Sequence, residues 1–171
     1  MNRRLSLKFF MCRSGAAAAE MALILPMLIA IMFGGFEAGA YLWTEHKVVK
    51  GVRDGARFAA RQSFTAYNCS TITDATILGQ VQNLTRTGQL SGGTAKVSTW
   101  TDNSQVTVTA ACQAPVANEY TSSGVYATQA DGAIHVTVSS TVAYPSLFGT
   151  LGFNTSGAVV KASANAAVMG I

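Results

Sequence analysis

The sequence has 171 residues, a formal net charge of +4 and a pI near 9.2. This length allows one domain of ordinary size beside a membrane segment. Four of the twelve Lys and Arg residues lie in residues 1–15, which contain no acid, so the remainder of the chain is neutral overall. The basic charge therefore indicates positive-inside topology, with a cytoplasmic N-terminus and an exported C-terminus, and it gives no reason to expect a nucleic-acid partner.

The N-terminus has the pattern of a leader followed by a membrane helix. Residues 1–15 form a short basic leader that ends at Gly15, and the apolar stretch 16–43 exceeds the roughly 20 residues needed to span a bilayer. Cleavage after Gly15 would make Ala16 the new N-terminus and Glu20 the fifth residue of the mature chain. This arrangement resembles class III signal peptides, the processing signal of type IV pilin-like proteins.

Glu20 needs an explanation, because a carboxylate near the start of a membrane segment costs roughly 2.5–3.5 kcal/mol on insertion scales. One interpretation pairs it with the amine freed at Ala16, in the same or an adjacent subunit, since residues four apart share a helix face. The alternative is an acid in the first helical turn at headgroup level, favoured by the helix dipole by at most about 1 kcal/mol.

Residues 44–62 predict an amphipathic extension of the membrane helix. From His46 to Arg61 the charges recur every three to four residues, and Val and Ala occupy the opposite face. Gly51, Gly55 and Ala59 form a stripe of small residues that permits close helix packing. The apolar side either covers the chain's own globular domain or packs against neighbouring subunits, and the two are compatible. A basic helix lying on the membrane surface is a third, less favoured interpretation.

Residues 63–171 predict the exported domain. Asp74 and Gly88 are suitable caps for a helix over 74–87. Period-two patterns then predict strands, although the Ala-rich last one also permits a helix; they cover 94–100, 105–112, 133–144 and 159–169. The expected fold class is α+β and pilin-like, with a long N-terminal transmembrane helix, its amphipathic extension, a small helix and an antiparallel sheet.

The three cysteines separate by compartment. Cys12 lies in the leader, on the reducing side of the membrane, whereas Cys69 and Cys112 both follow the span. Disulfides persist on the exported side, so we expect a Cys69–Cys112 bond rather than two unpaired buried thiols.

The sequence contains no nucleophile elbow, Walker A loop, dinucleotide fingerprint or Cys/His cluster at metal spacing. His46 lies among helix charges and His135 on the polar face of a predicted strand, so we expect both on the surface. No enzyme activity, cofactor or metal is predicted.

Three segments together resemble the TadE-like family, the minor pilins or pseudopilins of the tight-adherence (Tad) system. They are Arg13 to Leu28, Gly35-Phe36-Glu37, and Val52 to Ala60. The resemblance implies a non-enzymatic, membrane-anchored pseudopilin that assists assembly of Flp-type pili. Its implied partners are a prepilin peptidase, the Tad assembly platform, the major Flp pilin and other minor pilins. The implied location is a bacterial inner membrane, with the C-terminal domain periplasmic or extracellular and incorporation into the pilus left open.

Two other classes of protein fit parts of the sequence. The first is a single-pass envelope protein that keeps its leader as a signal anchor and binds a ligand through the exported domain. The second is a secreted hydrolase whose signal peptide is cut near Ala38-Gly39-Ala40, against which the charges of Glu20 and Glu37 argue.

Overall fold

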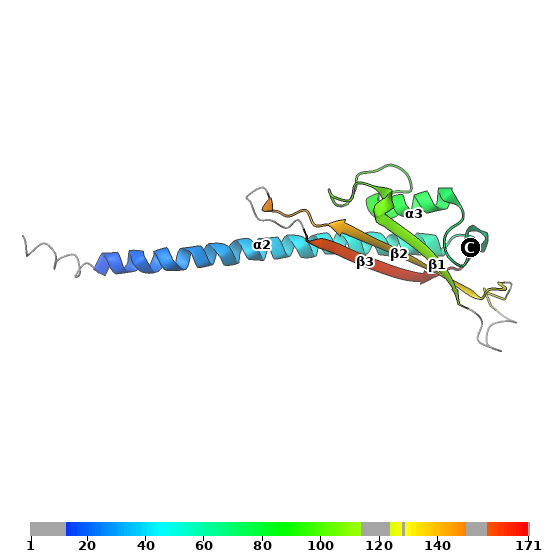
Figure 1. Ribbon diagram of the computed structural model, residues 1–171, viewed down its shortest axis with the longest axis horizontal. Helices are drawn as coiled ribbons and strands as arrows, with labels where there is room; N and C mark the ends of the chain where they lie inside the picture. The colour runs from blue at the N-terminus through cyan, green and yellow to red at the C-terminus, as the bar shows by residue number, and fades with distance from the viewer. Residues whose placement is uncertain (1–12, 114–123, 128, 150–156, 171) are drawn as a thin grey trace, which may run out of the picture. The chain divides into compact units, whose positions relative to one another are not determined.

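The structure is a computed structural model, and it describes residues 13–113, 124–127, 129–149 and 157–170. Contacts divide the chain into two units, Met1–Gly39 and Ala40–Ile171. Helix α2 (Arg13–Ala60) begins in the first unit and ends in the second, and it continues through Pro26 as one helix (Figure 1).

The second unit contains the last part of α2 and all the smaller elements. These are η1 (Phe64–Ala66), α3 (Ala75–Thr87), η2 (Asn103–Gln105), β1 (Val106–Gln113), β2 (Ala133–Ala143) and β3 (Val159–Ala167). A long apolar helix, a small helix and a three-stranded antiparallel sheet confirm the predicted α+β class.

Helix α3 has the predicted caps. The Asp74 carboxylate accepts hydrogen bonds from the backbone N–H groups of Thr76 and Ile77, at 2.8 and 3.2 Å. Gly88 adopts the left-handed conformation with φ 86°, and its N–H donates to the Leu84 carbonyl. Lys96 Nζ adds a donor 3.3 Å from the Thr85 carbonyl, so its charge also opposes the negative end of the helix dipole.

The sheet has the strand order β1-β2-β3 with antiparallel pairing throughout. Val106 pairs with Ser140, and Val142 pairs with Val160. Alternate residues of β1 and β2 are buried while their neighbours are more exposed, so one face of the sheet carries the core. The buried side chains of α2 and α3 join the same core, which places both helices on that face.

The prediction of a strand over 94–100 is wrong. This segment forms bends and turns, with a hydrogen bond from the Trp100 N–H to the Val97 carbonyl at 3.0 Å. A strand would direct Val97 and Trp100 to opposite faces, but both side chains are buried in the core. Burial of two large residues three apart favours a turn, and this preference overrides the short alternating pattern.

The outer part of α2 contacts α3 and Trp100 through its glycines. Gly51 lies so close to the Thr85 carbonyl that a Cβ atom would overlap it, and the same Cβ would be 3.2 Å from the Trp100 ring. At Gly55 a Cβ would overlap Thr85 Oγ1. Ala59, one turn further, is fully buried. The stripe of small residues therefore packs against the chain's own domain.

Strand β3 runs alongside α2, and contacts at both ends fix its position. At one end the Tyr41 hydroxyl donates to the Val159 carbonyl at 3.3 Å, and at the other the Met169 N–H donates to the Ala60 carbonyl at 2.8 Å. The helix rises about 28 Å between its two contact residues. The strand covers about 33 Å between its own. The similar lengths explain how an Ala-rich strand lies along one helix.

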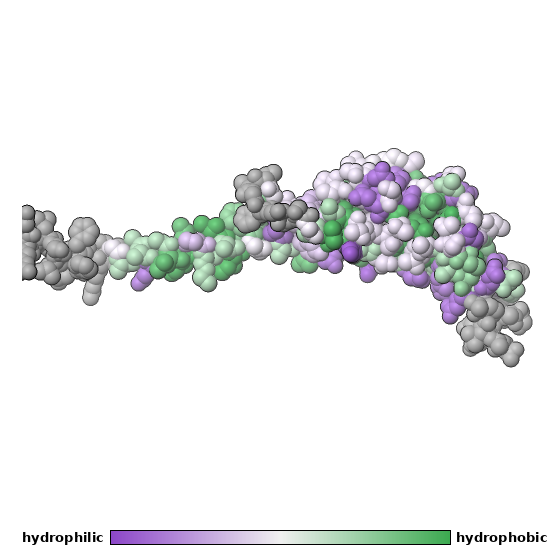
Figure 2. Space-filling view, in the orientation of Figure 1, coloured by the Kyte–Doolittle hydropathy of each residue, from purple (hydrophilic) through white to green (hydrophobic). Residues whose placement is uncertain are grey.

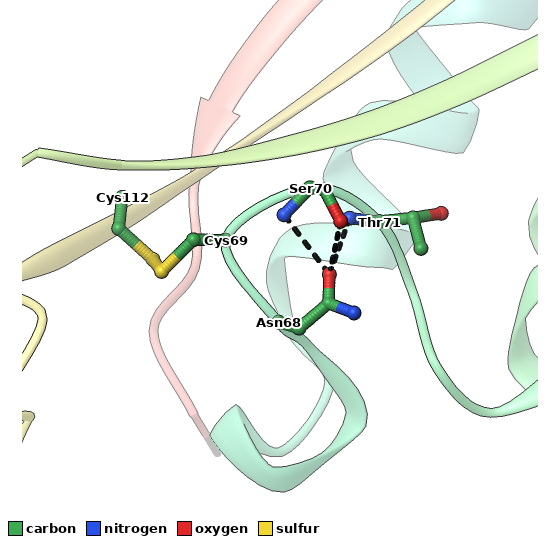
Figure 3. The surroundings of a disulfide bond; sticks show 5 residues. All are labelled: Asn68, Cys69, Ser70, Thr71 and Cys112. Carbon is green, nitrogen blue, oxygen red and sulfur yellow. Dashed lines mark hydrogen bonds between the residues drawn. A yellow bond between two sulfur atoms is a disulfide. The ribbon is translucent and has the colours of Figure 1, made fainter.

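A disulfide between Cys69 and Cys112 closes the segment after α2 onto β1, with a Cα–Cα distance of 4.9 Å. Asn68 orders the adjoining turn, because its side-chain oxygen accepts from Ser70 N, Ser70 Oγ and Thr71 N at 2.7–2.9 Å (Figure 3). The Ser70 carbonyl accepts from the Ala110 N–H on the free edge of β1. The pairing expected from the compartments is the one that the structure contains.

We predict that Gly55→Ala lowers the free energy of unfolding by about 1–3 kcal/mol, because the added methyl overpacks the α2–α3 contact. Gly79→Ala is the matched control on α3: its Cβ would meet nothing within 4 Å. It should stabilise by about 0.5–1 kcal/mol through helix propensity. Chemical unfolding of the full chain in detergent measures both.

Thr85→Ala tests the origin of the Gly55 effect, since it removes the hydroxyl that the new methyl would overlap. In the Thr85→Ala background, Gly55→Ala should lower the free energy of unfolding by less than it does in wild type. Gly51→Ala should lower it equally in both backgrounds, because its methyl meets the Thr85 carbonyl, which the Thr85→Ala change keeps. Equal destabilisation by Gly55→Ala in both backgrounds would contradict the proposed overlap.

We predict that Cys69→Ser lowers the stability of the exported unit and makes it sensitive to protease. Chain-entropy estimates for the loop closed by the bond give about 4 kcal/mol as an upper figure. Limited proteolysis of the oxidised wild type, Cys69→Ser and Cys112→Ser tests this, and the two variants should behave alike. Alkylation of both thiols in the folded, oxidised wild type would contradict the bond.

Candidate assembly surfaces

The first surface is the apolar part of α2. Within the described residues, α2 is the one helix long and apolar enough to cross a membrane, by length and composition. Figure 2 shows hydrophobic residues along this part of the helix. Its exposed large side chains are Met21, Leu23, Ile24, Leu25, Met27, Leu28, Ile29, Ile31, Met32, Phe36, Leu42 and Trp43. Such a surface is stable in hydrocarbon and unstable in water, so it indicates membrane anchoring.

Gly15, Ala16 and Glu20 all lie in the first turns of α2, and all are exposed. A Cβ on Gly15 would meet nothing within 4 Å, so packing does not require a glycine at this position. The four-residue spacing between Ala16 and Glu20 places them on one helix face. No described residue forms a hydrogen bond or ion pair with the Glu20 carboxylate. The described residues therefore leave both interpretations of Glu20 open.

Aromatic residues lie at the C-terminal end of the apolar stretch. Trp43 is 65% exposed, and Lys47 Nζ lies 5.6 Å from the centroid of its ring. This cation–π contact holds the ammonium group one helical turn beyond the indole. Trp at the interface with Lys on its aqueous side is typical of a transmembrane helix end.

Other residues of the same chain cover the stripe of Gly51, Gly55 and Ala59. Thr85 contacts both glycines, and Trp100 contacts Gly51. Another subunit could reach the glycines only by displacing α3. The sequence predicted the close approach but did not identify Thr85 or Trp100 as the partners. Thr85 lies on the buried face of its helix, four residues after Val81, but a threonine carries no apolar signal in the sequence. Its buried hydroxyl is satisfied locally by donation to the Val81 carbonyl at 2.7 Å.

The second surface is the exposed face of α2, opposite the buried stripe. A shallow depression runs along it, lined by His46, Val49, Lys50, Arg53, Asp54 and Arg57. The side chains of Lys50, Arg53 and Arg57 form no hydrogen bond or ion pair with described residues. Burial lowers the pKa of the nearby Lys96 ammonium, and the charge of Lys50 lowers it further, although Asp54 opposes this. We call this surface, from His46 to Arg57, the cationic face.

The described residues contain one close group of potential metal ligands, formed by Cys69, Cys112 and Asp131 within 4.8 Å of one another. Both sulfur atoms belong to the disulfide, so neither is a thiolate, and the group lacks the chemistry of a metal site. His46 is exposed, as expected, whereas His135 is half-buried on β2.

Comparison with protein families gives a match between residues 15–57 and the family model of TadE-like proteins. Comparisons with curated proteins and with solved structures found no match. The matched segment covers the position of the expected cleavage site, the apolar stretch and the cationic face. It ends before the exported sheet begins.

The family match agrees with the membrane-anchoring helix, and the similarity to TadE-like proteins points to an association with the Tad pilus machinery. Over residues 15–57, the chain is similar to TadE-like proteins.

Proposed function

We propose that the protein is a pseudopilin, or minor pilin, that assists the assembly of Flp-type pili. The observation that carries this proposal is the position of the family match on α2. It coincides with a helix that has an apolar surface at one end and an α+β unit packed against the other. The proposed partners are a prepilin peptidase, the Tad assembly platform, the major Flp pilin and other minor pilins.

The continuity of α2 supports retention of the membrane helix in the mature protein. The helix passes through residues 38–40, where an ordinary signal peptide would be cut, and its side chains from Thr44 to Ala60 form part of the core. A cut at this point would leave an exported domain that begins within its own core helix. We therefore favour a cut near Gly15, with the peptidase on the cytoplasmic side.

The cationic face supports a role in contacts between subunits. Its basic side chains project from the outer part of α2, next to the membrane boundary at Trp43, and α3 and the sheet leave them uncovered. In an assembly, acidic groups on a neighbouring pilin would pair with these side chains, and such pairs set register more than affinity.

The intact mass of the exported protein separates the three classes of interpretation. Loss of 15 residues is expected for a pseudopilin, no loss for an uncleaved anchor, and a loss near residue 39 for a secreted protein with an ordinary signal peptide. Either of the last two masses would overturn the proposed processing.

We predict that Gly15→Phe leaves the precursor at full length in the membrane. A peptidase has to draw the extended backbone close to its catalytic groups, and a bulky side chain at this position blocks the approach. Gly34→Phe is the matched control, since both glycines lie on α2 and a Cβ added at either one would meet nothing within 4 Å. The control should be processed normally, whereas mature protein of normal size from Gly15→Phe would contradict prepilin-type cleavage.

We predict that Glu20→Ala is inserted, cleaved and disulfide-bonded like wild type but does not support piliation. Removing the carboxylate removes an insertion penalty of roughly 2.5–3.5 kcal/mol, so insertion should be at least as efficient. It also removes the proposed partner of the amine at Ala16, which is needed only in assembly. Electron microscopy of cells, with the mass and disulfide state of the protein, gives all the readouts.

Glu20→Asp and Glu20→Gln refine this test, because the first keeps the charge and the second keeps the size. Partial piliation by Glu20→Asp and none by Glu20→Gln is the pattern expected for a charge pair. Normal pili in Glu20→Ala cells would contradict the pairing and leave Glu20 as a first-turn acid at headgroup level.

A further inference from the structure

The connection between β2 and β3 begins and ends beside the outer end of the apolar part of α2. Tyr144, the first residue after β2, packs edge-to-face on Tyr41, with ring centroids 5.2 Å apart. The Tyr144 N–H donates to the Ala158 carbonyl at 2.9 Å, which closes the connection at its base. Val159 follows directly, and its carbonyl accepts from the Tyr41 hydroxyl. Both ends of the connection are therefore attached at the level of Tyr41 on the helix.

The opposite end of the sheet lies far from this point. Met169 is bound to Ala60, at the other end of the segment of α2 that β3 follows. The exported unit consequently has one end at Tyr41, next to the membrane boundary marked by Trp43, and another end about 28 Å further along the helix.

The end at Tyr41 has the composition of a membrane-interface surface. Leu147 is 56% exposed and Val159 is 41% exposed, although the domain has a well-formed core available for apolar side chains. Leu42 and Trp43, on the adjacent turn of α2, are exposed as well. From Gly132 to Val160 the sequence contains no Asp, Glu, Lys or Arg, so no formal charge opposes contact with lipid. Tyr41 and Trp43 supply the amphipathic rings that are enriched at membrane interfaces, whereas Tyr144 is itself buried and packs on Tyr41.

We propose that the segment Tyr144–Gly149, together with Val159, is a second membrane contact that lies in the interface of the outer leaflet beside the end of the span. The occupant of this apolar surface is lipid, because the segment carries no formal charge and is attached to α2 at Tyr41, which is followed directly by the exposed Leu42 and Trp43. The contact would fix the exported unit against the bilayer and hold the cationic face at a defined height above it. This inference requires α2 to span a membrane but does not depend on a role in pili.

Site-directed spin labelling of the full chain in phosphatidylcholine–phosphatidylglycerol vesicles tests the proposal. A Cys12→Ser background keeps the Cys69–Cys112 bond, and a nitroxide is attached at Leu147→Cys. Leu42→Cys serves as the lipid reference. Met169→Cys is the matched aqueous control, because its side chain is 57% exposed at the opposite end of the unit. Intact mass and protease resistance establish that each labelled variant retains its disulfide and its fold.

Two collision rates of the nitroxide are measured. One is with oxygen, which partitions into lipid, and the other is with a water-soluble nickel chelate; their ratio reports whether the label lies in lipid or in water. We expect the oxygen-to-nickel ratio at Leu147 to be several-fold higher than at Met169 and similar to that at Leu42. A ratio at Leu147 equal to that at Met169 would overturn the proposal. Protection of the Leu147 label from both reagents, increasing with protein concentration, would also overturn it and would assign the surface to a second copy of the chain.

A second variant tests the same contact without a label at the site. Leu147→Asp should shift a nitroxide at Val159→Cys from oxygen-accessible to nickel-accessible, because a charge in the segment withdraws it from lipid. Leu147→Ile should leave the Val159 label unchanged. No shift with Leu147→Asp in a folded protein would contradict a lipid contact.

Discussion

The close packing of α2 on α3 is the contact on which the rest of the structure depends. Gly51 and Gly55 have no side chains, and this absence lets the Thr85 backbone and hydroxyl approach the helix. At this separation the Val side chains of α2 can reach the same core as Val81 and Trp100. A helix that must be long enough to leave the membrane would otherwise carry its exported part as an isolated rod, and isolated helical segments are marginally stable in water.

The residues of α2 suit three environments, which are hydrocarbon, the protein core and water, and each environment corresponds to its own residue pattern. The apolar part is hydrophobic around its whole circumference, as hydrocarbon requires. The outer part is divided into a buried small-residue side and the exposed cationic face. Trp43 and Lys47 mark the change between the two patterns. The same helix therefore supplies the membrane anchor and a part of the core of the exported unit.

The free edge of the sheet at β1 is partly covered by other segments of the chain. The Cys69–Cys112 bond and the hydrogen bond between Ser70 and Ala110 cover part of this edge, and the Gln82 side chain donates to the Val106 carbonyl at 3.1 Å. Covered edges do not recruit strands from other molecules. An assembly built from this protein would then use helix faces and the membrane end of the unit rather than extension of the β1 edge.

Local sequence determined the elements whose signals are complete within a few residues. Asp74 and Gly88 define α3 because capping depends on neighbouring backbone groups, and alternation defines β1 and β2 because one sheet face is buried. The Ala-rich last segment permitted a strand or a helix, and its pairing with β2 makes it strand β3. The membrane helix and the cysteine pairing followed from composition and compartment, and the TadE-like resemblance lay in the same contiguous stretch. Tertiary structure decided the remainder. The segment 94–100 forms a turn because only a turn buries both Val97 and Trp100 in the core. Thr85 became the partner of the glycines, and Tyr144 came to lie beside Tyr41, because contacts between residues distant in sequence depend on how the elements pack, which no local pattern records.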